Sequence, residues 1–392
     1  MVSAYSIPPY NAPPYHGPSG PTKPGTVAKA VYFMTNTASN AVVALNVAED
    51  GTIANVGSVT PTRGSGGNLV NPTTFAPNGP DALGSQGSIQ VLLFAVNPAS
   101  NTLSLFEISV EDPALLTLVG EPVDTGGQFP VSAAVSEALR LVCVANTGAQ
   151  SGVSCSKFDA KTGVAGFDSL RPIPLGQSSP PTGPANGIAQ VLFNEDDSAL
   201  VAVVKGNGTA MDPGFLALYP IELESGQLSY QYTKSSPAGA YFLFGSTLVP
   251  GTSRMLASVA GYGSAIIDLL NPGVPIASTN MTTIGAKAPC WAITSPVTGT
   301  GFIDDVLVSQ LVEVDLSTGA IVSSVSCENN DQGLIDMGTF GDKIYALSPG
   351  NGTVAAAVTV FDISGGRGSQ HSIQNFEIDF AGKNAEGLAI FY

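Results

Sequence analysis

Residues that commonly carry out acid–base or nucleophilic chemistry are scarce in this chain of 392 residues. It contains only two histidines, His16 in a Pro-rich stretch and His371 in a Gly- and Ser-rich stretch. A Ser or Cys nucleophile needs a neighbouring base, and neither histidine is placed to serve as one. We interpret both histidines as surface residues. The sequence therefore argues against a hydrolase that uses a catalytic triad.

Acidic residues occur in pairs, but their positions indicate turns. Glu195 to Asp197 and Glu49-Asp50 lie in turn sequences, where acidic residues are common. Hard oxygen ligands for Ca²⁺ could come from Glu386, Asp331, Asn186 and Asn68, but no local spacing supports a site. The cysteines and histidines also lack the spacing of zinc ligands. We predict no metal and no cofactor.

The groups that remain are amides and aromatic rings. Tyr and Trp carry a hydrogen-bond donor on a broad apolar surface, and amides polarise a carbonyl without transferring a proton. Such groups suit a neutral, largely apolar substrate whose reacting atoms are held close together. We predict the catalytic residues to be Tyr241, Trp291, Asn186 and Gln128. We predict the substrate-binding residues to be Arg63, Asn68, Phe129, Phe242, Asp331, Gln332 and Glu386.

Repeated β-meanders are the elements that must position these residues. Between residues 30 and 60, three short apolar runs are separated by a Ser/Asn turn and an Asp-Gly turn, which predicts three antiparallel strands. Further copies begin near residues 89, 139, 199, 254, 301 and 343. Seven such units, with no sustained helical period, predict an all-β, seven-bladed β-propeller of four-stranded antiparallel blades.

Each blade also needs an inner strand beside the central channel. Apolar segments in front of six meanders supply one, at residues 69–75, 129–135, 187–193, 241–248, 289–294 and 333–339. The C-terminal segment 386–392 supplies the seventh and is expected to pair with the first meander, which closes the ring. Loops that enter inner strands, and loops that join second to third strands, emerge on one face. We call it the mouth face and expect the substrate site there.

Composition narrows the possible partners and the compartment. A net charge of -16, with only 14 Lys and Arg, argues against nucleic acid and against an anionic membrane surface. No apolar run approaches the length of a membrane span. Residues 30–392 are expected to form one domain, preceded at 1–29 by an extended Pro- and Gly-rich arm. The cysteines and three glycosylation sequences, at Asn207, Asn280 and Asn351, favour a secreted protein.

The four cysteines are placed where disulfides could form. Cys143 and Cys155 lie symmetrically about a turn, so they are expected to face each other across one hairpin. Cys290 lies at the start of one predicted inner strand and Cys327 just before the next. We predict that all four are disulfide-bonded; four buried free thiols are the alternative.

Residues 31–59 and 141–148, together with the C-terminal closing strand, resemble the lactonase-like, 3-carboxymuconate-cyclase-like seven-bladed propellers of fungi. The resemblance extends over about residues 30–392. It implies one of three functions: lactone formation or hydrolysis on carboxylated substrates, a secreted binding or surface role without chemistry, or the hetero-Diels–Alder reaction of tropolone-sesquiterpenoid pathways. No catalytic motif of the muconate cyclases can be matched to residues of this chain.

The charge of the chain favours one of these functions. A tricarboxylate substrate needs several converging cationic groups, and a protein at -16 repels it. We therefore predict a cofactor-independent cyclase with a neutral, hydrophobic small-molecule substrate, namely a hetero-Diels–Alderase that joins a quinone-methide heterodiene to a terpene alkene. The alternatives are a lactonase or lactonising cyclase, and a non-enzymatic secreted binding protein.

Overall fold

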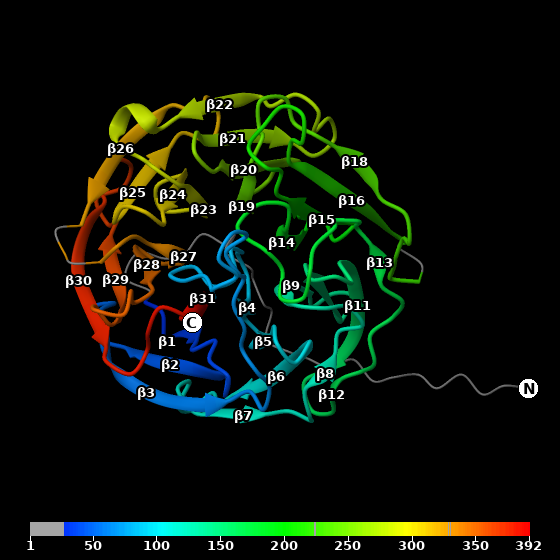
Figure 1. Ribbon diagram of the computed structural model, residues 1–392. Coiled ribbons are helices and arrows are strands. Elements are labelled where there is room, and N and C mark those ends of the chain that lie inside the picture. The colour runs from blue at the N-terminus through cyan, green and yellow to red at the C-terminus, as the bar shows by residue number, and fades with distance from the viewer. Residues whose placement is uncertain (1–26, 223–224, 328, 330) are drawn as a thin grey trace, which may run out of the picture.

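The computed structural model describes residues 27–222, 225–327, 329 and 331–392, so that the predicted arm at 1–29 lies outside them except for its last three residues. Seven antiparallel sheets stand around a common centre in a closed ring (Figure 1). The prediction of an all-β, seven-bladed propeller is confirmed. One short 3₁₀ helix, η1 (Thr282–Ile284), interrupts the strands. Within the described part, no helix is long and apolar enough to cross a membrane.

Blade 1 joins the two ends of the chain. Its strands, from the centre outwards, are β31 (Glu386–Phe391), β1 (Ala30–Met34), β2 (Ala41–Val47) and β3 (Ile53–Pro61). The register pairs Ala30 with Phe391 and Tyr32 with Ala389. The C-terminal strand therefore closes the ring as predicted, and it covers the edge that β1 would otherwise expose.

Three blades have an outer edge divided between two short strands. Blade 2 contains β4 (Ile89–Gln90), β5 (Phe94–Asn97), β6 (Thr102–Ile108), β7 (Leu116–Leu118) and β8 (Val123–Asp124). Blade 3 contains β9 (Pro130–Ser136), β10 (Leu141–Asn146), β11 (Gly152–Asp159), β12 (Gly163–Val164) and β13 (Arg171–Pro172). Blade 4 contains β14 (Ile188–Phe193), β15 (Ala199–Val204), β16 (Phe215–Glu222), β17 (Gln227–Leu228) and β18 (Thr233–Ser235).

The last three blades are regular four-stranded meanders. Blade 5 contains β19 (Leu243–Leu248), β20 (Arg254–Val259), β21 (Gly263–Asp268) and β22 (Ala277–Asn280). Blade 6 contains β23 (Pro289–Ser295), β24 (Thr300–Asp305), β25 (Gln310–Val314) and β26 (Ile321–Ser326). Blade 7 contains β27 (Ile335–Phe340), β28 (Lys343–Ser348), β29 (Ala356–Asp362) and β30 (His371–Ile378).

The inner strand predicted at residues 69–75 was wrong. The inner strand of blade 2 is the two-residue β4, which directly precedes β5. Residues 62–88 instead form a long connection that runs across the middle of the ring (Figure 1). The apolar run Leu69-Val70 resembles the start of a strand, but the Pro and Gly residues that follow it cannot sustain a central strand.

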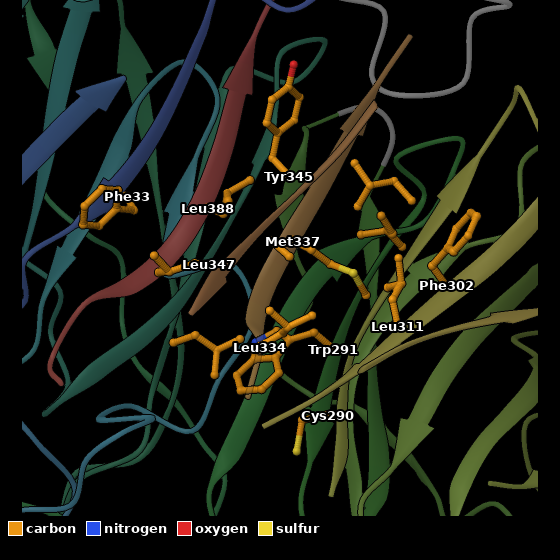
Figure 2. Packing of buried hydrophobic residues seen from close by; sticks show 14 of the residues in the cluster. Phe33, Cys290, Trp291, Phe302, Leu311, Leu334, Met337, Tyr345, Leu347 and Leu388 are labelled. Atoms are coloured by element: carbon orange, nitrogen blue, oxygen red, sulfur yellow. The ribbon is translucent and has the colours of Figure 1, made fainter. Parts of the chain in front are cut away.

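Apolar side chains fill the spaces between blades. Figure 2 shows Trp291, Leu334, Met337 and Leu388 in one such layer, which draws on blades 6, 7 and 1. These side chains are at most 7% exposed. Because a blade cannot bury both faces alone, this packing between neighbours supplies most of the hydrophobic stabilisation.

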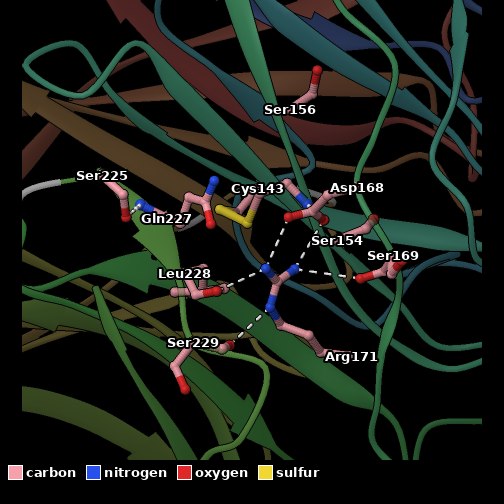
Figure 3. A network of polar contacts seen from close by, with 12 residues as sticks. Cys143, Ser154, Ser156, Asp168, Ser169, Arg171, Ser225, Gln227, Leu228 and Ser229 are labelled. Atoms are coloured by element: carbon pink, nitrogen blue, oxygen red, sulfur yellow. Dashed lines mark hydrogen bonds and ion pairs between the residues drawn. A yellow bond between two sulfur atoms is a disulfide. The ribbon is translucent and has the colours of Figure 1, made fainter. Parts of the chain in front are cut away.

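A buried arginine joins blades 3 and 4. Arg171, at the start of β13, makes a bidentate ion pair with Asp168 at 2.8 and 2.9 Å. Its guanidinium also donates to the carbonyl oxygens of Leu228 and Ser229, each at 2.8 Å (Figure 3). The planar guanidinium group thus donates hydrogen bonds both to a carboxylate on its own blade and to backbone carbonyl groups on the next blade.

The disulfide prediction holds for one pair of cysteines and fails for the other. Cys143 and Cys155 are directly opposed on β10 and β11 and form a disulfide. Cys290 and Cys327 are free thiols, the first buried and the second half-buried. Cys290 is held in β23 within the core that blade 6 shares with its neighbours, whereas Cys327 follows the outermost strand of the same blade. Inner and outer positions of one blade are too far apart for a disulfide.

Candidate functional site

Residues 81–88, which we call the hub segment, fill the axis of the ring. Its backbone is buried from Ala82 onwards. The hub segment hydrogen-bonds to six inner strands: to Val131 and Ser132 in β9, Ala189 in β14, Ser246 in β19, Ala292 in β23, Asp336 in β27 and Glu386 in β31. The central channel behind the mouth face is therefore occupied by the chain itself.

Gln86 is the most extensively bonded side chain of the hub segment. Its Nε2 donates to the carbonyl oxygen of Ala292 at 2.9 Å, and its Oε1 accepts the Ala292 N–H at 3.2 Å. Gln190, in β14, bonds in the same two-fold manner to the backbone of Ser246, at 2.6 and 3.0 Å. At Ser246 and Ala292, a β-bulge interrupts the backbone hydrogen bonds between the inner strand and the next strand of its blade. The side-chain amides of Gln190 and Gln86 supply the hydrogen bonds that a neighbouring strand would otherwise make there.

Ionisable groups surround the hub segment. Glu386 is fully buried, and its Oε1 accepts the backbone N–H groups of Ala82 and Leu83, the second at 3.2 Å. Lys205, at the end of blade 4's second strand, donates from Nζ to the Gly84 carbonyl oxygen at 2.6 Å and lies 5.1 Å from the ring centre of Phe244. Neutralising or hydrogen-bonding contacts of this kind are required for charges buried away from water.

Burial shifts the pKa values of the ionisable residues around the hub segment. It raises the pKa of Asp81 to about 6 and the pKa of Asp336 to about 7. It also raises the pKa of Glu386 well above its usual range, and the nearby charge of Asp81 adds to the shift. Burial lowers the pKa of Lys205 to about 8, although the charge of Asp81 opposes that change. Asp81 keeps partial solvent contact where the hub segment begins.

A groove of about 420 Å³ opens on the mouth face over blade 1, and we call it the rim groove. One wall is the β1–β2 connection and the other is the β30–β31 connection that leads to Glu386. Its lining residues are Thr35, Thr37, Ser39, Ala41, Val59 and residues 380–384. Phe380 and Val59 are 57% and 47% exposed, so the rim groove presents apolar surface to solvent.

Polar groups of the rim groove are available for a ligand. Thr35 Oγ1 accepts the Ala41 N–H at 3.1 Å, and Thr37 Oγ1 donates to the Ser39 carbonyl oxygen at 2.9 Å. In the described part of the chain, the Ser39 hydroxyl and the exposed Lys383 ammonium make no hydrogen bond or ion pair. Among the ten lining residues, Lys383 is the one ionisable group.

Two predicted site residues, Trp291 and Glu386, lie at the hub, where both bond to the backbone of the hub segment. Trp291 is completely buried, and its Nε1 donates to the Ser85 carbonyl oxygen at 3.1 Å. Glu386 holds the start of the hub segment, as described above. Its second carboxyl oxygen, Oε2, is buried and lacks a partner among the described residues. Both residues therefore hold the hub segment in this structure.

The other predicted residues are distributed around the mouth face. Asn68 donates to Asn384 Oδ1 at 2.8 Å and so borders the rim groove. Gln128 accepts the Ser179 hydroxyl, Asp331 accepts Asn375 Nδ2, and Arg63 pairs with Glu121. Tyr241 and Gln332 are exposed, Asn186 and Phe242 half-buried, and Phe129 buried. In the part of the chain described, no two of the eleven predicted residues hydrogen-bond to each other.

Sequence reasoning missed several residues that the structure brings together. Asp81, Gln86 and Asp336 were not singled out, because no motif marks a loop that turns into the axis of a propeller. One signal was present in the sequence: polar residues within otherwise apolar inner strands, such as Gln190 and Asp336. In a propeller, a polar residue at such a position is expected to meet another polar group at the axis.

Comparisons with known proteins show the fold alone. No protein-family model and no curated protein sequence matches the chain. Among solved structures, the chain is similar to a protein from Bacteroides fragilis provisionally assigned as a 6-phosphogluconolactonase, with a TM-score of 0.62 and 12% identity over 93% of this chain and 98% of that chain. It is also similar to the periplasmic gluconolactonase of Pseudomonas aeruginosa, with a TM-score of 0.62 and 16% identity over 92% and 99%.

A third structure has the same architecture but a different name. The hypothetical selenium-binding protein of Sulfolobus tokodaii aligns with a TM-score of 0.61 and 8% identity over 94% of both chains. Identities this low leave the activity open, since one fold carries many chemistries. What the comparisons show is that this chain shares the propeller fold of these two proteins.

Proposed function

We propose that the protein binds a neutral, mainly apolar small molecule in the rim groove and promotes ring formation, as a cofactor-independent cyclase of the hetero-Diels–Alder type. The observation that carries the proposal is the lining of the rim groove. Exposed apolar surface from Val59 and Phe380 lies beside hydroxyl donors, and Lys383 is the single ionisable group. A site of this composition favours an uncharged substrate that needs orientation more than proton transfer.

The proposed reaction requires no acid–base or nucleophilic group from the protein. In a hetero-Diels–Alder addition, the π electrons of a heterodiene and an alkene form one carbon–carbon and one carbon–oxygen bond, and no proton or leaving group moves. The Ser39 hydroxyl and the Lys383 ammonium are free to donate to the heterodiene oxygen, which makes the heterodiene a better electron acceptor. Phe380 would pack against the alkene partner. The Trp291 donor, already bonded to Ser85, takes no part in this scheme.

A lactonase is the second candidate. It is favoured by the names of two similar structures, a gluconolactonase and a protein provisionally assigned as a 6-phosphogluconolactonase. In that reaction, Lys383 would polarise the lactone carbonyl oxygen while water attacks the carbonyl carbon, the ring C–O bond breaks, and a proton from the water ends on the released hydroxyl group. The two candidates therefore use the same groove but differ in the charge and polarity of the substrate.

One set of assays separates the candidates. The protein is incubated with an ortho-quinone methide generated in solution and a cyclic sesquiterpene alkene, and in parallel with D-glucono-1,5-lactone and its 6-phosphate. We expect faster adduct formation with one enantiomer in excess, and lactone hydrolysis at the uncatalysed rate. Turnover of a lactone in place of adduct formation would support the second candidate. No effect on either reaction would leave a binding role without chemistry.

A matched pair of variants tests the location of the site. Phe380→Ala removes an aromatic ring from the rim groove. Phe75→Ala removes a comparably exposed ring from the mouth face outside it. We expect the first variant to lose most of the acceleration and the second to keep it. Equal activity of the two variants would show that the rim groove is not the site.

A further inference from the structure

Three sequences of the form Asn-x-Thr lie on the same face of the ring. Asn207 is in the β15–β16 connection, Asn351 is in the β28–β29 connection, and Asn280 ends β22 just before the chain returns to the centre. Connections of these two kinds emerge on the mouth face. All three asparagines are exposed. Asn-x-Thr in an exposed loop is the acceptor sequence for N-linked glycosylation.

The three sites share one local geometry. In each, the Asn Oδ1 accepts both the backbone N–H and the hydroxyl of the Thr two residues later, with hydroxyl distances of 2.6 Å at Thr209, 2.6 Å at Thr282 and 2.7 Å at Thr353. The Asn Nδ2 is the atom that would carry a sugar. Within the part of the chain described, this atom has no hydrogen-bond partner at any of the three sites. A sugar on Nδ2 would therefore break no contact of the fold.

The same turn is built with Asp on the opposite face. Asp50, Asp315 and Asp362 each accept the backbone N–H and the hydroxyl of a Thr or Ser two residues later, in connections between third and fourth strands. Asp closes this turn as well as Asn does. Turn geometry alone therefore does not require Asn on the mouth face, where the Nδ2 of each Asn is available for an additional role.

One further turn on the mouth face serves as an internal control. Asn71 is exposed and accepts the N–H of Thr73 at 2.9 Å, but Pro72 stands between the two residues. Proline at this position excludes glycosylation. Asn71 therefore has the same backbone contact but lacks an acceptor sequence. If the turn alone caused a modification, Asn71 would be modified as well.

We propose that Asn207, Asn280 and Asn351 carry N-linked glycans, which shield the mouth face over blades 4, 5 and 7. In the transfer, Nδ2 loses a proton and bonds to the first sugar carbon, and the bond between that carbon and the diphosphate of a lipid-linked oligosaccharide donor breaks. This donor is confined to the secretory route, with which the Cys143–Cys155 disulfide is consistent.

The pattern leaves a defined part of the mouth face uncovered. Blades 1 to 3 have no acceptor sequence in their described loops. The glycan on Asn351 would stand beside the rim groove, because Ala356, at the end of the same connection, donates its N–H to the carbonyl oxygen of Ala381 in the groove wall at 3.0 Å. Access to the rim groove is then expected from the side of blades 1 and 2.

Peptide mapping of the protein purified from the organism that makes it tests the proposal. Digestion with peptide-N-glycosidase converts each glycosylated Asn to Asp, which marks the site. We expect conversion at Asn207, Asn280 and Asn351 and none at Asn71. Unmodified Asn at two or more of the three sequences would overturn the proposal.

Variants secreted from a eukaryotic host assign the sites. Thr209→Ala, Thr282→Ala and Thr353→Ala should each remove one glycan, whereas the matched Thr→Ser variants keep both the acceptor sequence and the hydroxyl contact and should retain it. Pro72→Ala should add a fourth glycan at Asn71. Loss of no glycan in the Ala variants would show that the carbohydrate is attached elsewhere and would overturn the assignment.

Discussion

Replacing Glu386 by Gln tests whether a buried carboxyl group holds the hub segment in the axis. Gln keeps an oxygen that can accept the N–H groups of Ala82 and Leu83. Its amide nitrogen would replace Oε2, which is buried and has no partner among the described residues. Glu386→Gln therefore keeps the acceptor oxygen and removes the ability to ionise, and it places two N–H donors where the described residues offer no partner.

The expected effect depends on pH, and its sign follows from the direction of the pKa shift. Burial raises the pKa of Glu386 in the folded protein, so the folded chain binds this proton more tightly than the unfolded chain. The wild type is then most stable below the unfolded pKa and loses about 1.4 kcal/mol per pH unit as the pH rises towards the folded pKa. The unpaired amide N–H groups of Glu386→Gln carry a cost that does not depend on pH, so the prediction concerns the slope: the stability of the variant relative to the wild type should rise by that amount per pH unit.

Other groups at the hub contribute with the same sign. The pKa of Asp336 rises from 3.8 to about 7, so ionising its buried carboxyl group costs about 4 kcal/mol above neutral pH. The pKa of Asp81 rises to about 6. Stability of the wild type should therefore fall between about pH 4 and pH 7. The neutral form of Lys205 is favoured only above about pH 8, outside this window.

Glu386→Met is the matched control, because it has a similar volume and accepts no hydrogen bond. It leaves two buried N–H groups without an acceptor, at about 1 to 3 kcal/mol each and at every pH. The assay is urea unfolding from about pH 4 to pH 8. Parallel pH profiles for Glu386→Gln and the wild type, or equal stability of the Gln and Met variants, would refute the reasoning.

Three further predictions concern the closure of the ring, the contact between blades 3 and 4, and the disulfide within blade 3. Removing residues 386–392 deletes β31 and exposes the edge of β1, so we expect calorimetry to show no cooperative unfolding transition. Arg171→Met leaves a carboxylate and two carbonyl groups without their donor and should cost about 3 to 5 kcal/mol in urea unfolding. Arg63→Met, which removes an exposed ion pair, should change the same free energy by less than about 1 kcal/mol. Replacing Cys143 and Cys155 together by Ala releases a short loop and should cost about 3 kcal/mol, measured against the oxidised wild type.

The sequence predicts the ring well because the propeller is encoded locally. Every blade repeats alternating apolar strands separated by turns such as Asp50-Gly51, and these turns form wherever they occur in the chain. Ring closure was predictable for a different reason. The sequence shows seven meanders but only six apolar segments in front of them, so one blade lacks an inner strand. The apolar C-terminal segment 386–392 is not part of any meander and can supply that strand.

Blade 2 shows where this local encoding fails. Its inner strand is reduced to Ile89 and Gln90, because the eight preceding residues leave the plane of the blade and enter the axis. Nothing within residues 81–88 specifies that path. It is specified by Asp336, Glu386 and backbone groups of β9, β14 and β23, which lie far away in sequence. Contacts of this separation have no sequence period that could indicate them.

The hub segment also explains why predicted residues at the axis are a poor guide to a substrate site. A polar side chain on an inner strand must find a partner, and in an open channel that partner would be water or a ligand. Here the partner of Trp291 and Glu386 is the chain's own backbone. To reach these residues, a ligand would have to expel a segment that is hydrogen-bonded to six blades. The rim groove requires no such rearrangement, since the donors at Ser39 and Lys383 already face open space beside exposed apolar surface.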